Sequence, residues 1–247
     1  MEAREYERMA EAEQRSWWFR GRRRVLNEVI ERLPLSPESH ILDIGCGTGG
    51  NLSMLARHGQ VTGVEFSEQA AAIARGHDAG EVVVGPAEQV PLEEGGFHLI
   101  TLLDVLEHLD DEAPALAEVR RLLVPGGFLL VTVPAFMMLW SGHDVALHHR
   151  RRYRRPELKG RLQEAGLEIQ WLTYYNTALF PAVAGVRLTR RLLGGGADEA
   201  DVADDAPGPL SGVLEGLFAA ERHIVGRLPL PFGVSLVGVA REPDPGS

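Results

Sequence analysis

Residues 143–155 carry the densest group of side chains that could do acid–base chemistry. They read HDVALHHRRRYRR and place His143, Asp144 and His149 just before a run of arginines. A histidine titrates near neutral pH and a carboxylate can orient it, so Asp144 and His149 predict a base or an anchor for a bound substrate. Two other interpretations are open from these residues: a metal site and a patch that binds nucleic acid.

Charge and ligand spacing argue against both of these alternatives. The 247 residues include 35 acidic and 25 basic side chains, a formal net charge of −10, which disfavours a general polyanion binder. A metal set of His143, Asp144, His148 and His149 matches no strong ligand template, so we expect no metal. A basic helix start that only faces water is a further, simpler interpretation.

A glycine-rich loop is the second candidate site. The run ILDIGCGTGG places Gly45, Gly47 and Gly50 in GxGxxG spacing, and Glu65 follows Gly45 by twenty residues. On its own this spacing also fits the dinucleotide-binding fingerprint. Asp43, however, would repel a pyrophosphate at the following helix N-terminus and is better suited to a loop that faces a cationic ligand.

An alternation of strands and helices must position these side chains. Helices are expected near 50–58, 67–76, 111–123 and 156–165. The alternation predicts an α/β protein with a mostly parallel, doubly wound sheet, which binds ligands beyond the carboxyl ends of its strands. The strands are expected at 40–44, 60–65, 81–84, 97–103, 128–133, 167–173 and 234–240.

The chain is expected to form one domain, residues 1–247. Residues 2–33 should form a helix within an N-terminal cap. A helical insertion late in the chain contains the acidic stretch GGGADEADVADDAPGP. It could be a lid that also contacts a membrane surface, or, as the simpler interpretation, an ordinary packed pair of helices or a homodimer interface. The expected divisions are a cap (1–36), a core (37–176 and 232–242) and the insertion (177–231).

The remaining composition predicts a cytoplasmic protein. The single cysteine, Cys46, excludes an internal disulfide and fits a reducing compartment. The N-terminus is charged and lacks the apolar core of a signal peptide. No apolar run approaches the ~18 residues of a membrane-spanning helix.

Five consecutive motifs resemble the class I S-adenosylmethionine-dependent methyltransferases. The resemblance covers about residues 40–135, and the motifs keep the family's order and spacing. It implies S-adenosylmethionine as cofactor and a seven-stranded Rossmann-like sheet whose last strand is antiparallel. In a minimal fold of this family strands six and seven form a hairpin, whereas here nearly sixty residues separate them and predict a helical insertion. The motifs are ILDIGCGTG, VEFSEQA, GPAEQVPLEEGGFHLI, LLDVLEHL and LLVPGGFLLVTVP.

The resemblance also implies a set of cofactor contacts. Glu65 would hold both ribose hydroxyls and Phe66 would pack on the adenine. The segment SWWFRGRRR resembles members whose first helix covers the cofactor, with Trp18 excluding water and Arg20 or Arg24 meeting the methionine carboxylate. The cofactor set is Asp43, Gly45, Cys46, Gly47, Gly49, Glu65, Phe66, Ala87, Glu88, Leu103, Asp104, Val105, Trp18 and Arg20.

Residues 143–155 resemble a subgroup that acts on small molecules and shows an Asp, a His five residues on, and then Arg-Arg-Tyr. Methyl transfer is a direct displacement, so aligning the acceptor matters most, and a base is needed only if the acceptor loses a proton. The catalytic candidates are His149, Asp144, His143 and His108. The expected substrate contacts, which could hold an anionic acceptor, are Arg151, Arg152 and Tyr153.

The expected function is transfer of a methyl group from S-adenosylmethionine to an O or N atom of a small-molecule acceptor, anionic or hydrophobic. One alternative is a non-catalytic cofactor-binding or partner-binding protein of the same fold. The others are a tRNA methyltransferase and an NAD-dependent dehydrogenase. We expect no nucleic-acid partner, because the chain is acidic and lacks an appended RNA-binding module.

Overall fold

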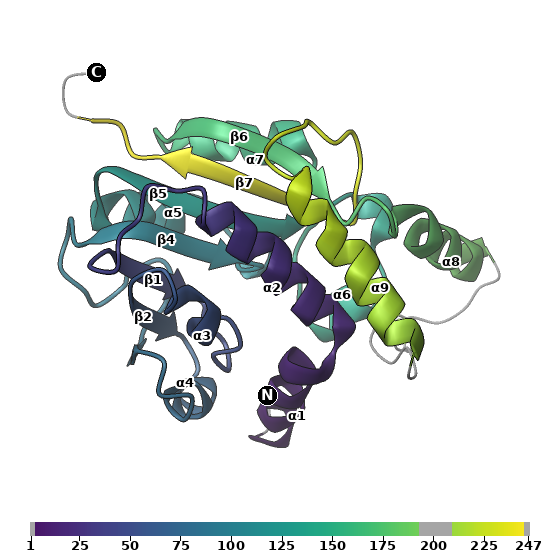
Figure 1. The fold of residues 1–247 in the computed structure, drawn as a ribbon, viewed down its shortest axis with the longest axis horizontal. Helices are drawn as coiled ribbons and strands as arrows, with labels where there is room; N and C mark the ends of the chain where they lie inside the picture. The colour runs from purple at the N-terminus through teal and green to yellow at the C-terminus, as the bar shows by residue number, and fades with distance from the viewer. Residues whose placement is uncertain (1–2, 193–208, 245–247) are drawn as a thin grey trace.

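The computed structural model describes residues 3–192 and 209–244, and its centre is one seven-stranded sheet (Figure 1). The strand order is β3-β2-β1-β4-β5-β7-β6. Neighbouring strands are parallel except β7, which runs antiparallel to both β5 and β6. The strands are β1 His40–Ile44, β2 Gln60–Glu65, β3 Glu81–Val84, β4 Phe97–Leu103, β5 Leu123–Pro134, β6 Glu168–Tyr175 and β7 Ser235–Arg241.

The sheet confirms the predicted fold class and the seven predicted strands. Only β5 differs by more than one or two residues, because it begins at Leu123 and includes a Pro-Gly-Gly sequence that we expected to precede the strand. Leu123 pairs with Phe97 across a register shift, which extends β5 backwards. The strand order reverses between β1 and β4, and ligands bind such sheets at this switch point.

Side chains of the strands alternate between two cores, as the pleat requires. In β1, Leu42 and Ile44 belong to one core and Ile41 to the other. Asp43, between them, therefore projects toward the second core. Helices α5 (Ala113–Leu122) and α7 (Arg155–Glu164) cover the first core; the second is covered by α2 (Trp17–Ile30), α3 (Leu52–Leu55), α4 (Glu68–Arg75) and α9 (Pro209–Ala220) (Figure 1).

The single N-terminal helix expected over 2–33 is two helices, α1 (Ala3–Arg15) and α2. Ser16 divides them: its backbone is extended, and its side chain accepts a hydrogen bond from the backbone N of Trp18. Because Ser16 caps the first turn of α2 in this way, α1 ends before it and does not continue into α2. Helix α1 consequently lies against the glycine loop, where Thr48 Oγ1 donates to Glu13 at 2.6 Å.

The insertion between β6 and β7 contacts the domain through α9 and α8 (Phe180–Leu192). Helix α9 lies along α2 (Figure 1), with the ring of Phe218 6.4 Å from that of Trp18. Helix α8 approaches the short helix η2 (Met137–Leu139), where Arg187 donates to the carbonyl of Leu139. Residues 193–208, with almost all of the acidic stretch, lie outside the described residues. Among the described residues, no helix is long and apolar enough to span a bilayer.

Gly21 allows α2 and α9 to approach closely, because a Cβ at this position would lie 2.9 Å from Cδ1 of Phe218. We expect Gly21→Val to lower the free energy of unfolding by about 1–3 kcal/mol through overpacking. Gly216→Ala is the matched control: it lies in α9 with open space around it and should stabilise by about 0.5–1 kcal/mol. Urea unfolding measures both, and an unchanged stability for Gly21→Val would contradict this helix contact.

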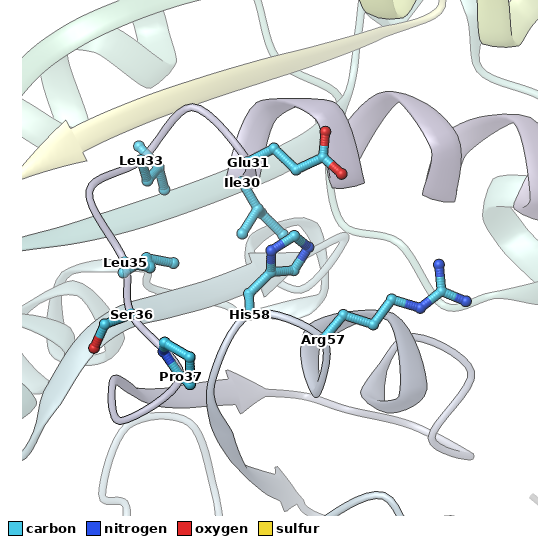
Figure 2. A pocket seen from close by; sticks show the side chains of 8 residues that line it. All are labelled: Ile30, Glu31, Leu33, Leu35, Ser36, Pro37, Arg57 and His58. Carbon is cyan, nitrogen blue, oxygen red and sulfur yellow. The ribbon is translucent and has the colours of Figure 1, made fainter.

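The pocket in Figure 2 lies at the opposite edge of the sheet from the glycine loop. Its lining residues come just before β1 and β2, at the amino ends of these strands. His58 is engaged there, with Nε2 3.0 Å from Asn27 Oδ1. The pocket is therefore separate from the edge where this fold binds ligands. Its lining residues are Ile30, Glu31, Leu33, Leu35, Ser36, Pro37, Arg57 and His58.

Candidate active site at the carboxyl ends of the strands

The glycine loop leaves β1 at the carboxyl edge of the sheet. Gly45, Gly47 and Gly49 have φ values of 73°, 56° and 88°, in the left-handed region that glycine adopts without steric cost. A side chain at Gly45 would also lie 2.6 Å from Val105, so the loop can approach the segment after β4 only without one. The loop thus presents its backbone beside the ends of β1 and β4.

Glu65 ends β2 and fixes this loop. Its Oε2 accepts a hydrogen bond from the backbone N of Gly47, and its Oε1 from that of Ser67, each at 2.9 Å. A carboxylate offers about four lone-pair sites, so it can still accept hydroxyl donors. The next side chain, Phe66, is 79% exposed, which leaves its ring face available for stacking beside the carboxylate.

Asp43 is buried at the end of β1 and holds a hydrogen bond of 2.5 Å from Thr101 Oγ1 on one oxygen. The other oxygen, Oδ2, has no partner among the described residues. Burial raises the pKa of Asp43 to about 7, although Thr101 and the charge of Arg22 oppose the shift. An unpartnered, buried carboxylate oxygen suits a cationic donor.

Arg22 is a site residue that the sequence analysis missed. Helix α2 carries its buried guanidinium to the ends of β4 and β5, where Nη2 lies 2.7 Å from Asp104 Oδ2 and 2.8 Å from Thr132 Oγ1. Its Nε has no partner among the described residues. The predicted Trp18 covers it, with the ring centroid 5.3 Å from Cζ, in a cation–π contact.

The structure does not bring Arg20 or Arg24 to this cluster. Both pair with Glu215 of α9, at 2.7 and 2.8 Å, and so join the insertion to α2. Arg22 shares a helical stripe with the buried residues Val25 and Leu26, which Arg20 does not. That spacing was the available sequence signal for choosing Arg22.

The other predicted cofactor residues follow β1, β3 and β4. Asp104 has a φ of 61°, unusual for a non-glycine residue, and is flanked by the buried Leu103 and Val105. Cys46 is buried, and burial raises the pKa of its thiol, so it stays neutral. After β3, Ala87 is half-buried and Glu88 exposed.

His149 and Asp144 are paired, as the sequence predicted. Nδ1 of His149 lies 2.9 Å from Asp144 Oδ1. Arg152 clamps both oxygens of Asp144, at 2.7 and 3.0 Å. Burial opposes ionisation of Asp144, but the hydrogen bond to His149 and the charge of Arg152 lower its pKa well below the usual range. The ionised carboxylate favours a proton on Nδ1, which leaves a lone pair on Nε2 of His149.

Glu107 and His108, in the short helix η1 (Leu106–His108) after β4, complete this cluster. The rings of His108 and His149 meet edge to face, 4.8 Å between centroids. Desolvation and then His149 lower the pKa of His108 to about 4, although the residue keeps solvent contact. Glu107, which the sequence analysis missed, is fully buried; burial and then Asp104 raise its pKa well above the usual value.

The predicted substrate contacts are held by protein groups instead. Arg151 and the hydroxyl of Tyr153 both donate to Glu112 Oε1, each at 2.7 Å, and Arg152 is held by Asp144. Removing one member of a fully buried ion pair, such as Arg152 and Asp144, lowers the free energy of unfolding by about 3–5 kcal/mol, so releasing Arg152 to a substrate would be unfavourable. These contacts engage the groups that an anionic acceptor would need, and the expected role of the three residues in binding such an acceptor stays a prediction.

Large apolar side chains are exposed in the same segment as His149. Met137 and Met138 lie in η2 after β5, and Val145 and Leu147 lie in and after α6 (Gly142–Ala146). Each is at least 39% exposed. His143, the remaining catalytic candidate, lies half-buried on α6. The segments on either side of Asp144 therefore present exposed apolar side chains.

Comparisons with known proteins match this architecture. The family model described as "Methyltransferase domain" matches residues 42–131. A ubiquinone biosynthesis O-methyltransferase from Pseudomonas aeruginosa is 33% identical over 166 residues, which are 59% of this chain and 71% of that protein.

Two solved structures share the fold. A chain of the complex between the Haloferax volcanii Trm112 methyltransferase activator and the putative methyltransferase matches with a TM-score of 0.62 and 18% identity, over 96% of this chain and 94% of that one. A putative methyltransferase from Bacillus halodurans matches with a TM-score of 0.60 and 21% identity, over 89% of this chain and 98% of that one. At these identities, the likeness concerns the fold alone.

Proposed function

The chain belongs to the class I S-adenosylmethionine-dependent methyltransferases, and we propose that it methylates an oxygen or nitrogen atom of a small molecule with an apolar part. The observation that carries the proposal is the pair of His149 and Asp144. This pair follows β5, and the glycine loop follows β1, at the same carboxyl edge of the sheet. The O-methyltransferase name of the Pseudomonas relative supports oxygen as the first atom to test.

The residues at this edge fit S-adenosylmethionine. Glu65 can accept the ribose hydroxyls, and the exposed ring of Phe66 can stack on the adenine. The ammonium and carboxylate of the methionine part match Asp43 Oδ2 and Arg22 Nε, two buried polar atoms without partners among the described residues. When bound, the cofactor supplies an electrophilic methyl group on a sulfonium.

His149 and its neighbours bind and orient the acceptor. Nε2 of His149 binds the acceptor's hydroxyl or amine, and takes its proton if the acceptor must lose one. Asp144, itself clamped by Arg152, keeps the ring in one orientation. The exposed Met137 and Val145 contact the apolar part of the acceptor and exclude water from it.

Labelled S-adenosylmethionine supplied with a metabolite extract tests this function. We expect the label in a small-molecule fraction, extractable into organic solvent. Label in RNA would instead support a tRNA methyltransferase and overturn the proposed acceptor class. If no fraction takes the label while S-adenosylhomocysteine still binds, the chain is a non-catalytic cofactor-binding protein.

Cofactor binding should depend on pH through Asp43. Its folded-state pKa of about 7 means that the carboxylate facing the cofactor's ammonium is mostly protonated at pH 6 and ionised at pH 8. We expect calorimetry to show that the dissociation constant of S-adenosylhomocysteine falls about tenfold from pH 6 to pH 8. Asp43→Asn should bind more weakly and lose this part of the dependence. An identical pH profile in Asp43→Asn would contradict the assignment.

The same group should affect stability with a defined sign. A carboxyl group whose folded pKa lies above its unfolded pKa stabilises the fold at low pH and loses that contribution as pH rises. Asp43 should therefore stabilise the cofactor-free protein below about pH 4, and this contribution to the free energy of unfolding should disappear as the pH rises to about 7. Asp43→Asn removes this slope.

A further inference from the structure

Glu107, His108 and His149 form a cluster of three side chains of types that ligate metals. Their ligand atoms all lie within 4.8 Å of one another. They come from two segments, one after β4 and one after α6, which are joined where the backbone N of Arg150 donates to the carbonyl of Glu107 at 2.7 Å. Arg151 reinforces the junction by donating to the carbonyls of Leu109 and Asp110. The cluster is thus held together by the fold.

The carboxyl group of Glu107 indicates that the cluster lacks a cation. It is fully buried, and neither of its oxygens has a hydrogen-bonding partner among the described residues. The two guanidinium groups that influence it, Arg22 and Arg152, are each paired with another carboxylate, Asp104 and Asp144. A buried carboxyl without a partner is costly unless it is protonated or meets a cation.

The two imidazoles are prepared to bind a cation. His149 presents Nε2, because Asp144 holds its Nδ1, and a carboxylate behind a histidine in this way is the usual support of a metal ligand. The ring of His108 lies against that of His149, 4.8 Å between centroids, so its ligand nitrogen belongs to the same cluster. It also keeps contact with solvent, so that an ion can reach the cluster.

We propose that Glu107, His108 and His149 bind one divalent cation of the zinc type, with an open coordination position for the acceptor. Two imidazoles and one carboxylate suit zinc better than the oxygen-seeking calcium or magnesium. Zinc binds such atoms at about 2.0–2.2 Å, so the ligand atoms must close by about 1 Å, which rotation of the accessible His108 ring allows.

This site deepens the proposed function and rests on it. An acceptor hydroxyl bound to the cation would have a lowered pKa, as zinc-bound water does. Its proton passes to solvent; the bond from oxygen to the methyl carbon forms as the bond from that carbon to sulfur breaks. With the ion bound, Nε2 of His149 is a metal ligand, so it holds the acceptor through the ion and no longer takes the acceptor's proton itself. The acceptor class is an alcohol or phenol.

Zinc titration of the full chain, dialysed against chelator and freed of any purification tag, tests the site. Calorimetry with zinc chloride should show one equivalent bound. Glu107→Gln and His149→Ala should each weaken binding at least about 100-fold. His148→Asn is the matched control: this exposed neighbour has a φ of 58°, which Asn tolerates, and zinc binding should not change.

The outcomes separate the site from the proposed function. If the parent protein binds no zinc, or Glu107→Gln binds it as tightly as the parent does, the metal site is wrong. Methyl transfer that persists in excess chelator would leave the proposed function standing without the metal. Loss of methyl transfer on chelation, restored by zinc in the parent but not in Glu107→Gln, supports the site. S-adenosylhomocysteine binding, measured in each variant, shows that the fold is intact.

Discussion

Replacing His149 with alanine should lower the turnover number about 10²–10⁴-fold, the usual contribution of a positioned acid–base group. The pair of His149 Nδ1 and Asp144 is buried and held by Arg152, so its geometry does not depend on a bound substrate. The substitution removes the group that we propose faces the acceptor, but it leaves the glycine loop and Glu65 intact. The affinity for S-adenosylhomocysteine should stay within about twofold.

The control for this variant is His148→Asn, one residue away and exposed, which should keep the turnover number of the parent. Rates measured with the acceptor fraction identified by labelling, at saturating cofactor, give the comparison. A turnover number for His149→Ala equal to that of the parent would remove this residue from the reaction. If cofactor affinity fell in parallel, the effect would be structural.

Replacing Glu65 with alanine should weaken S-adenosylhomocysteine binding about 100-fold. The carboxylate accepts two backbone donors that fix the glycine loop, from Gly47 and Ser67, and is proposed to accept the ribose hydroxyls. Hydrogen bonds to charged groups contribute about 1.5–3 kcal/mol each, so the loss of two such bonds is sufficient for this change.

Glu68→Ala is the matched control for Glu65→Ala. Glu68 lies three residues further along, is exposed, and pairs only at the surface with Arg75 at 2.8 Å. A surface pair of this kind contributes little, so cofactor affinity should stay within about twofold. Calorimetry on both variants decides: if Glu65→Ala binds as tightly as the parent, Glu65 does not hold the ribose.

Local patterns in the sequence were sufficient to predict the sheet and the glycine loop. The short apolar run of β1 is a strand buried on both faces, because Leu42 and Ile44 fill one core and Ile41 the other. The loop glycines were recognisable from their spacing, although the positive φ values fall on Gly45, Gly47 and Gly49 and not on Gly50 of the GxGxxG pattern. The pair of Asp144 and His149 was also predictable, because five residues separate its members within one segment.

Long-range partners were not predictable in the same way. Arg151 and Tyr153 were predicted to contact a substrate from a resemblance, and their common partner Glu112 could not be predicted because it lies about forty residues earlier in the chain. Arg22 is different, because it extends the apolar stripe of Val25 and Leu26 and was recognisable from that spacing; Arg20 and Arg24 were preferred to it from the resemblance alone. Glu107 was missed because nothing in DVLEHL shows that its carboxyl is buried without a partner.

A crystal structure of the protein with S-adenosylhomocysteine would show whether the methyl donor lies on the glycine loop and whether His149 faces its sulfur. We predict the ribose hydroxyls on Glu65, the amino-acid end between Asp43 and Arg22, and an open path from the sulfur to the imidazole of His149. A sulfur that points away from His149, or side chains that fill the space between them, would contradict the account.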